Sequence, residues 1–346
     1  MDWVTCPGCG SRDVKRFGTR ELKRQKIQRY ACRGCGKVFS DHQLEHKSYP
    51  PRVILNAVSI YNLGRTLEQT KRELARRFHQ KIPMSTIASW VKEYSNVCTY
   101  ARLREHGMRL YSPADLILSK RLEHQQVYDF RLHHAKLELA LRRPEHRRFS
   151  TLRDYLLRVP TEAFPHRIFA HNGALEQRAS KLRADLLEVR KLERHNLANL
   201  LAELGLMLAK TNRDRHSKVE EFMLVNDSCT VACEVPVYLT ANDIAYFRGN
   251  GFSIDFESYR TPITGHIDVL QVRNGLIHVL DYKPEASRVN PVEQLTVYAL
   301  ALASRTKLAV KDFKCAWFDG RECFEFFPLH AVCPKPKVIC STKITT

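Results

Sequence analysis

The sequence contains no apolar run that approaches the roughly 20 residues needed for a transmembrane helix. Its first residues also lack the basic and then apolar pattern of a secretory signal peptide. Internal repeats and low-complexity tracts are missing too, and 44% hydrophobic with 27% charged residues is the composition of a folded chain. We therefore expect neither secretion nor membrane insertion, and 346 residues should form two or three domains.

Acidic residues are few compared with basic ones. The chain has 37 Asp and Glu residues against 56 Lys and Arg, which gives a formal net charge of +19 and a pI near 9.6. The excess is concentrated in residues 1–110, which hold 22 basic and nine acidic side chains. Such a charge favours polyanionic partners, and nucleic acid is the first of them, although charge alone does not distinguish DNA from RNA.

Cysteine is the residue whose arrangement is most informative. Four of the eleven cysteines form two nearly identical knuckles, Cys6-Pro-Gly-Cys9-Gly and Cys32-Arg-Gly-Cys35-Gly, with 22 residues between them. Clustered pairs of this kind indicate metal ligation in a reducing compartment such as the cytoplasm, rather than disulfides. The spacing predicts that the four thiolates hold one structural Zn²⁺ in a ribbon over residues 1–48, and the knuckle glycines permit the positive φ that such turns use.

The arm between the two knuckles is rich in Lys and Arg. Its composition predicts a basic β-hairpin that follows the phosphates of a nucleic acid. We expect the direct contacts to come from Lys23, Arg24, Lys26 and Arg29. The alternative is a structural zinc staple whose charged face is only solvated.

Residues 51–110 follow the period of helices. The first helix should cover residues 53–63, after the break at Pro50-Pro51. Thr66 and Gln69 form a capping-box pattern that starts a second helix over residues 67–78. A short turn then leads to a third helix, so this segment is predicted to be a helix-turn-helix domain.

The third helix, from Ser85 to Tyr94, distributes its residues as a recognition helix does, and Ser85 is its expected N-cap. Its apolar side should pack inward through Ile87, Trp90 and Val91. Its short polar side chains are expected to contact DNA, namely Ser85, Thr86, Ser89 and Lys92. The alternative is a plain three-helix bundle. The ribbon and these helices together resemble the N-terminal part of insertion-sequence transposases, over roughly the first 95 residues.

The rest of the chain divides into a helical part and a part with strands. Residues 114–223 are expected to be mostly helical, with 113–210 forming a linker or spacer. The strand period then predicts strands at 230–239, 263–272, 276–282, 313–318 and 323–327, and a helix at 292–303. This order indicates an α/β domain over 211–332 and a tail over 333–346. The predicted fold class is therefore a multidomain α+β protein.

Two predicted strands carry acidic residues near their ends. Asp281 and Lys283 lie on one face of the second strand, because strand residues alternate. A turn at Asn274-Gly275 joins the two strands as a hairpin, which brings Asp268 of the first strand near Asp281. Two carboxylates beside an ammonium group suit Mg²⁺ or Mn²⁺ and the cleavage of a phosphodiester.

The motifs G-H-I-D-V-L, H-V-L-D-Y-K and E-Q-L-T-V-Y-A-L-A-L resemble the RecB-like branch of the PD-(D/E)XK nucleases, whose core is a restriction-endonuclease-like fold. The resemblance implies that Asp268 and Asp281 bind the divalent metal and that Lys283 is catalytic. It also implies that Gln294 and Tyr298, four residues apart on the predicted helix, assist at the substrate phosphate. It covers about residues 216–303.

A metal ligand upstream of these motifs is less well defined. The resembled family often adds a His or Glu from a preceding helix, and His216 is the candidate, with Glu220 and Glu221 as rivals. Glu234, which precedes the G-x-x-D strand, is a further candidate. Some relatives carry an iron–sulfur staple, but no C-x-x-C pair occurs near the C-terminus. We therefore expect buried free thiols at Cys315, Cys323, Cys333 and Cys340.

The sequence thus predicts a metal-dependent DNA endonuclease with its own DNA-targeting modules, suited to mobile-element or genome-defence biology. One alternative is a DNA-binding regulator whose nuclease fold is inactive. Another is an RNA-binding or RNA-processing protein. The sequence does not determine the oligomeric state, and a homodimer is one option.

Overall fold

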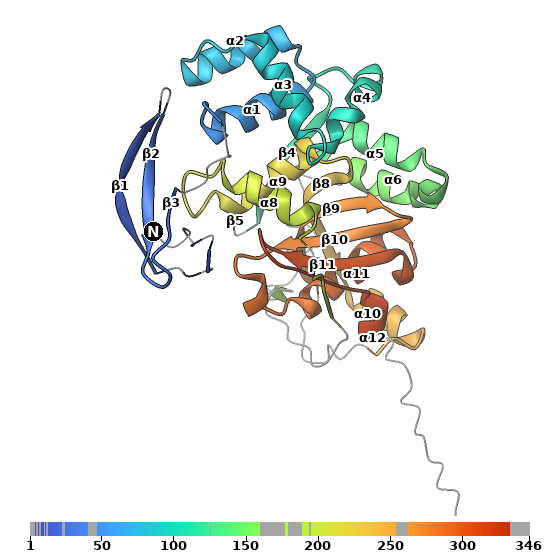
Figure 1. The fold of residues 1–346 in the computed structure, drawn as a ribbon. Coiled ribbons are helices and arrows are strands. Elements are labelled where there is room, and N and C mark those ends of the chain that lie inside the picture. The colour runs from blue at the N-terminus through green and yellow to red at the C-terminus, as the bar shows by residue number, and fades with distance from the viewer. Residues whose placement is uncertain are drawn as a thin grey trace, which may run out of the picture.

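The structure is a computed structural model of the chain. It describes residues 4, 6, 8–9, 11, 13–22, 25–40, 47–124, 126–159, 177–178, 189–193, 195–253 and 262–332. Figure 1 shows an N-terminal ribbon, a group of helices and a large sheet that is covered by helices. No helix in these ranges combines the length and the apolarity needed to cross a membrane.

The ribbon is a small antiparallel sheet that follows the first knuckle. Its strands are β1 (Val14–Leu22), β2 (Gln25–Cys32) and β3 (Val38–Ser40), in the order β1-β2-β3. Tyr30 and Phe39 stack within it, with ring centroids 6.0 Å apart. The predicted hairpin is therefore confirmed.

Three helices follow the ribbon, as predicted. They are α1 (Pro51–Asn62), α2 (Leu67–Phe78) and α3 (Met84–Tyr94), followed by η1 (Thr99–Arg102) and α4 (Arg104–Leu110). The capping box of Thr66 and Gln69 is present at the start of α2. The prediction that Ser85 caps α3 is wrong. Pro83 holds the N-cap position and no side chain caps this end, so Ser85 lies inside the first turn.

The rest of the chain is built on one large mixed sheet. Its order is β4-β5-β8-β9-β10-β11-β12-β7, with β6 beside β9. The strands are β4 (Ile117–His124), β5 (Gln126–His133), β6 (Gln177–Arg178), β7 (Arg190–Lys191), β8 (Thr230–Leu239), β9 (Ile263–Arg273), β10 (Leu276–Tyr282), β11 (Phe313–Phe318) and β12 (Cys323–Phe326). The five strands predicted downstream of residue 226 are thus confirmed, as is the helix α11 (Val292–Thr306), which joins the parallel strands β10 and β11.

The prediction that residues 114–223 are mostly helical is wrong for residues 117–133. These residues form the antiparallel hairpin β4-β5, which pairs with β8 and so extends the sheet. The segment is rich in long charged side chains that favour helix, but Leu122, Phe130 and Leu132 lie at every second position of the strands and are buried in the core. Tertiary packing of this period-two pattern decides the structure. The described residues of the region also include the helices α5 (His134–Leu141), η2 (Pro144–Phe149), α6 (Ser150–Arg158) and α8 (Leu197–Leu206).

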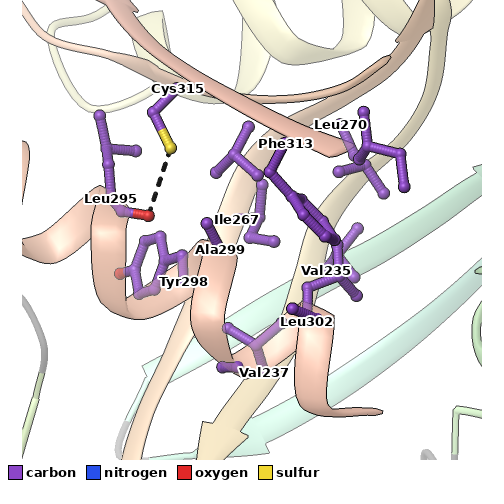
Figure 2. Packing of buried hydrophobic residues seen from close by; sticks show 14 of the residues in the cluster. Val235, Val237, Ile267, Leu270, Leu295, Tyr298, Ala299, Leu302, Phe313 and Cys315 are labelled. Carbon is purple, nitrogen blue, oxygen red and sulfur yellow. Dashed lines mark hydrogen bonds between the residues drawn. The ribbon is translucent and has the colours of Figure 1, made fainter. Parts of the chain in front are cut away.

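Two hydrophobic clusters lie on the two faces of the sheet. The first joins the sheet to α5, α6, α11 and α10 (Ala241–Gly249). Figure 2 shows Leu295, Ala299 and Leu302 of α11 against Val235 and Phe313 of the strands. Short elements complete this side of the domain: η4 (Ala286–Arg288), η5 (Val310–Asp312) and α12 (Pro328–Val332).

The second cluster joins the opposite face of the sheet to α8 and α9 (Arg215–Asn226), and also to α1, α2 and α3. In Figure 1, α8 and α9 lie between the sheet and these N-terminal helices. A buried hydrogen bond of 2.9 Å from Asn62 Nδ2 to Asn226 Oδ1 links α1 to α9. The N-terminal helices therefore share a core with the large sheet.

Candidate metal centres

Three side chains from different elements meet where β9 and β10 lie against the first turn of α9. The Nε2 atom of His216 lies 2.7 Å from Oδ2 of Asp268. One ligand atom each from His216, Asp268 and Asp281 can be chosen so that all three lie within 4.8 Å of one another. The structure therefore brings together the residues that the sequence proposed as ligands of Mg²⁺ or Mn²⁺.

The strand register explains this meeting. Leu280 of β10 pairs with Val269 of β9, so that Asp281 lies beside Asp268 in the hairpin. The side chains of β9 do not alternate regularly between the two faces of the sheet at Asp268. Ile267, on one side of Asp268, packs into the first hydrophobic cluster, whereas Val269, on its other side, packs into the second. The backbone N–H of Tyr282 donates to Oδ2 of Asp268 at 3.1 Å and holds the carboxylate in place.

The two carboxyl groups are close, with 2% of the Asp281 side chain and 13% of the Asp268 side chain exposed. Burial and the neighbouring Asp268 raise the pKa of Asp281 well above its usual range. Burial acts in the same direction on Asp268, but His216 and Lys283 overcome it and hold the pKa of Asp268 below its usual value. Oδ1 of Asp281 is buried and accepts no hydrogen bond from a described residue. A divalent cation would supply a ligand contact for this buried oxygen and further positive charge beside the two carboxyl groups.

The imidazole of His216 is held between carboxylates. Its Nε2 atom lies 3.1 Å from Oε1 of Glu220 as well as 2.7 Å from Asp268. Burial disfavours the charged imidazole, but the two carboxylates raise the pKa of His216 to about 12. A metal at this position would have to displace that proton, since only the neutral imidazole can coordinate.

Lys283 stands at the mouth of the cluster. Its Nζ atom lies 2.8 Å from Oδ2 of Asp281, and 28% of its side chain is exposed to solvent. Burial lowers the pKa of an ammonium group, but Asp281 and Asp268 raise the pKa of Lys283 above its usual value. The backbone N–H of Lys283 donates to the carbonyl of Phe318, which anchors the residue just beyond β10. A charged and partly exposed group thus lies beside the ligands.

Gln294 and Tyr298 are adjacent on α11, as predicted. Nε2 of Gln294 donates to the hydroxyl of Tyr298 at 2.9 Å. Burial and the nearby Asp281 raise the pKa of the Tyr298 hydroxyl, which stays protonated. The ring packs on β9 at Gly265, where a Cβ atom would lie 2.1 Å from Cε1 of Tyr298. The glycine of the G-x-x-D motif is therefore required for steric reasons, because any larger residue would clash with the Tyr298 ring. Figure 2 shows this ring beside Ala299.

The rival upstream carboxylates occupy different places. Glu220 is buried next to His216, with 1% of its side chain exposed. Glu221 pairs with Lys218 at 2.5 Å and is 47% exposed, so the structure does not bring it to the cluster. The pKa of Glu234 is raised well above its usual range, mainly because the side chain is buried and also because Glu220 and Asp268 are near. Glu234 has a φ of 51°, a left-handed conformation that is uncommon in a strand.

Sequence reasoning missed Arg131. This residue lies on β5, pairs with Cys233 of β8, and places Nη2 at 3.7 Å from Oε2 of Glu220. Arg131 thus supplies a cation beside the buried carboxylate of Glu220. Residues 128–132 alternate between apolar and polar side chains, and this pattern is the signal that could have placed Arg131 on a strand.

The four cysteines of the ribbon also converge. Sγ of Cys6 lies 3.5 Å from Sγ of Cys35, and Cys9 lies 3.5 Å from Cys32. All four sulfurs lie within 4.8 Å of one another, the arrangement that four ligands of one Zn²⁺ require. Burial opposes ionisation of Cys6, but the amides of Gly8 and Cys9 lower its pKa to about 6, which favours the thiolate.

The prediction that the knuckle glycines use positive φ holds only in part. Among the described ones, Gly36 has a φ of 73°, whereas Gly8 and Gly34 do not have positive φ. Gly8 instead donates its N–H to Sγ of Cys6 at 3.3 Å. The backbone conformation of Gly8 therefore points its amide toward the sulfur of Cys6. Gly10 lies outside the described residues.

The residues expected to contact DNA are only partly described. Lys23 and Arg24 lie outside the described residues, as does the side chain of Lys26. The side chain of Arg29 is half-buried on β2. On α3, the expected contact residues Ser85, Ser89 and Lys92 are exposed. Thr86 is half-buried. The inward-facing Ile87 and Trp90 are buried as predicted, and Val91 is half-buried.

The C-terminal thiols match the expectation where the structure describes them. Cys315 and Cys323 are buried and free. Cys315 donates its S–H to the carbonyl of Leu295 at 3.5 Å, as Figure 2 shows. Cys333 and Cys340 lie outside the described residues, as does the tail from residue 333 onward.

Comparison with known families agrees with this geometry. The family model of the PD-(D/E)XK nuclease superfamily matches residues 131–325. The match begins at Arg131 and includes the whole cluster around Asp268 and Asp281. No curated protein and no solved structure is significantly similar to the chain. The resemblance predicted from the motifs is confirmed, and because the match covers more than half of its length, the chain belongs to the PD-(D/E)XK nuclease superfamily.

Proposed function

We propose that the protein is a Mg²⁺- or Mn²⁺-dependent endonuclease that cleaves DNA. The observation that carries the proposal is the meeting of His216, Asp268 and Asp281 within 4.8 Å, with the ammonium group of Lys283 at 2.8 Å from Asp281. Membership of a nuclease superfamily supports the reaction type. Oxygen and imidazole ligands beside a cation suit the hydrolysis of a phosphodiester.

Each residue has a definite part in this proposal. Asp268, Asp281 and His216 would hold the cation, which when bound polarises the scissile phosphate and lowers the pKa of a water molecule. Lys283 stabilises the negative charge that develops on the phosphate oxygens. Tyr298, with its hydroxyl held by Gln294, orients the phosphate.

The N-terminal modules are proposed to hold the DNA. The supporting observations are the basic excess of residues 1–110 and the exposed polar face of α3. In this proposal the ribbon of residues 1–48 binds Zn²⁺ and, with the helices of 51–110, places the duplex for the domain that cuts. A role in mobile-element or genome-defence biology suits a chain that carries both targeting and cleavage.

Part of the basic charge on the helices is already paired. Arg76 and Arg77 of α2 both contact Glu73, and Arg72 contacts Glu68 at 3.3 Å. Exposed pairs of this kind are weak and can open when a phosphate approaches. The ribbon and α3 are therefore the surfaces from which we expect most of the binding.

Incubation with supercoiled plasmid tests the proposed activity. The full chain should nick or linearise the plasmid with Mg²⁺ or Mn²⁺, whereas an exonuclease would need free ends. Asp281→Asn should abolish cleavage and keep DNA binding, because it removes a ligand charge without changing the shape of the side chain. Asp129→Asn is the matched control, since Asp129 is 53% exposed on β5 and pairs only with Arg121 among the described contacts.

Three outcomes would contradict the proposal. Equal cleavage by wild type and Asp281→Asn would assign the activity to another site. A wild type that binds DNA but cleaves no duplex, single strand or RNA with either metal would favour a regulator with an inactive nuclease fold. Cleavage of RNA alone would favour an RNA-processing enzyme.

A further inference from the structure

The ribbon exposes an aromatic side chain that its own folding does not use. Phe17 of β1 is 48% exposed. The ribbon packs instead through Tyr30 and Phe39, whose rings stack on each other, and Tyr30 is buried. A single exposed apolar residue is common on protein surfaces, so exposure alone does not indicate binding. What points to binding is that this ring lies beside a cation on a basic sheet.

A bulge in β1 sets the position of this ring. Arg16 pairs with Tyr30 and Thr19 pairs with Gln28, so Phe17 and Gly18 both lie opposite Arg29. Gly18 has a φ of 77°, which a residue with a side chain rarely adopts. Bulges of this kind change the direction in which a neighbouring side chain points.

The side chain of Gln28 holds the bulge in place. Its Nε2 atom donates to the carbonyl of Gly18 at 2.7 Å and to the carbonyl of Arg29 at 2.9 Å. The irregular backbone is therefore satisfied by hydrogen bonds rather than left open. This arrangement fixes Phe17 outward as a defined platform.

One cation lies against the ring, and others are exposed on the same strand. The guanidinium carbon of Arg29 lies 5.5 Å from the centroid of the Phe17 ring. The side chains of Lys15, Arg16 and Arg20 on the same strand are exposed. The patch thus offers one aromatic face for a planar group and several positive charges for the phosphates attached to it.

This combination fits an unpaired nucleotide better than a duplex. Proteins that bind single strands stack bases on aromatic rings and follow the backbone with basic side chains. In a duplex the faces of the bases are covered by their neighbours, so the ring would have nothing to stack on. An acidic peptide would match the cations but would leave the ring without a partner.

We propose that Phe17, with Arg29 beside it, is a stacking site for an unpaired nucleobase, so that the ribbon binds single-stranded segments of DNA. The inference rests on the proposed function, in which the ribbon holds nucleic acid. It adds the structural class of the substrate, namely DNA that is single-stranded, frayed or branched where the ribbon contacts it.

Binding measurements on the full chain test the proposal. The Asp281→Asn background prevents cleavage during the measurement. The probes are a 20-nucleotide single strand with a central 2-aminopurine and the duplex of the same sequence, at several salt concentrations. Phe17→Ala should weaken single-strand binding by about tenfold and remove most of the fluorescence quenching, because one stacked base contributes on that order. Duplex binding should stay unchanged.

The salt dependence separates stacking from charge. Phe17→Ala should leave the slope of affinity against salt unchanged, because no counterion is involved, whereas Arg29→Ala should reduce it. Phe17→Tyr should restore binding, since it keeps the ring. The control is Tyr246→Ala, which removes another exposed aromatic ring, 67% exposed on α10. Zinc content measured for each variant shows that the ribbon is intact.

The outcomes are distinguishable. Phe17→Ala that leaves single-strand binding unchanged, or that weakens strand and duplex equally, overturns the stacking site while the proposed DNA binding stands. A wild type that binds neither probe removes the proposed role of the ribbon and the stacking site with it. Tyr246→Ala that matches Phe17→Ala would likewise overturn it, because the effect would not be specific to the ribbon.

Discussion

The contact between Gly265 and Tyr298 allows a sharp test of how the site is built. A Cβ atom at position 265 would lie 2.1 Å from Cε1 of Tyr298 and 2.8 Å from both Cζ and the hydroxyl oxygen. Carbon atoms in contact are normally about 3.5 to 4 Å apart. In Gly265→Ala the ring must therefore move by more than about 1 Å, and overpacking of this kind typically costs about 1 to 3 kcal/mol of folding free energy.

The same change should reduce activity. The displaced ring carries the hydroxyl that Gln294 holds, and Gly265 is only three residues from Asp268 on β9. A misplacement of about 1 Å in a site can reduce a rate by about a hundredfold. We therefore expect a loss of stability and a loss of cleavage from the addition of one methyl group.

A double-mutant cycle measures the contact directly. Tyr298→Leu removes the three atoms that the new Cβ would strike, so Gly265→Ala should cost less in the Tyr298→Leu background than in the wild type. Urea unfolding followed by tryptophan fluorescence gives the free energies, since Trp317 is buried in the same domain. Gly249→Ala is the matched control, because a Cβ atom there meets no atom within 4 Å. Equal costs in the two backgrounds would refute the steric argument.

Three further predictions address the other contacts. Lys283→Ala should lower the cleavage rate by about a hundred- to a thousandfold while Mn²⁺ titration still shows binding, because it removes charge stabilisation rather than a ligand. Cys9→Ser should release the zinc, and a metal content that stays at one ion per chain would contradict the four-cysteine site. Asn62→Ala should destabilise the chain by about 1 to 3 kcal/mol in urea unfolding, because Oδ1 of Asn226 loses its buried donor. A change below about 0.5 kcal/mol would mean that the link between α1 and α9 adds little.

The elements that the sequence predicted well are those whose pattern is local. The strands that carry Asp268 and Asp281 are short apolar runs separated by an Asn-Gly turn, and such a turn selects a hairpin register by itself. The capping box of Thr66 is likewise a signal confined to four residues. The short sequence patterns predict the hairpin and the helix start correctly because the burial and hydrogen bonding of the folded chain favour the same structures.

The elements that were missed depend on partners far away in the sequence. The β4-β5 hairpin has long charged side chains that favour helix, and its extended form is stabilised by pairing with β8 and by burial of its apolar side chains in the core. Arg131 was missed for the same reason, because its proximity to Glu220 exists only once β5 lies beside β8. The start of α3 was shifted because Pro83, rather than Ser85, holds the N-cap position.

The shared core of the N-terminal helices and the sheet was also beyond sequence reasoning, and it has a functional consequence. Helix α9 carries His216 in its first turn, and its last residue, Asn226, bonds to Asn62 of α1. Buried Lys136 donates to the carbonyls of Met223 and Leu224 and holds the same end of the helix from the side of α5. Because α9 is fixed by both the helices and the sheet, the position of the proposed metal ligand depends on both. The N-terminal helices are therefore part of the framework that positions His216, which a binding module joined only by a linker would not be.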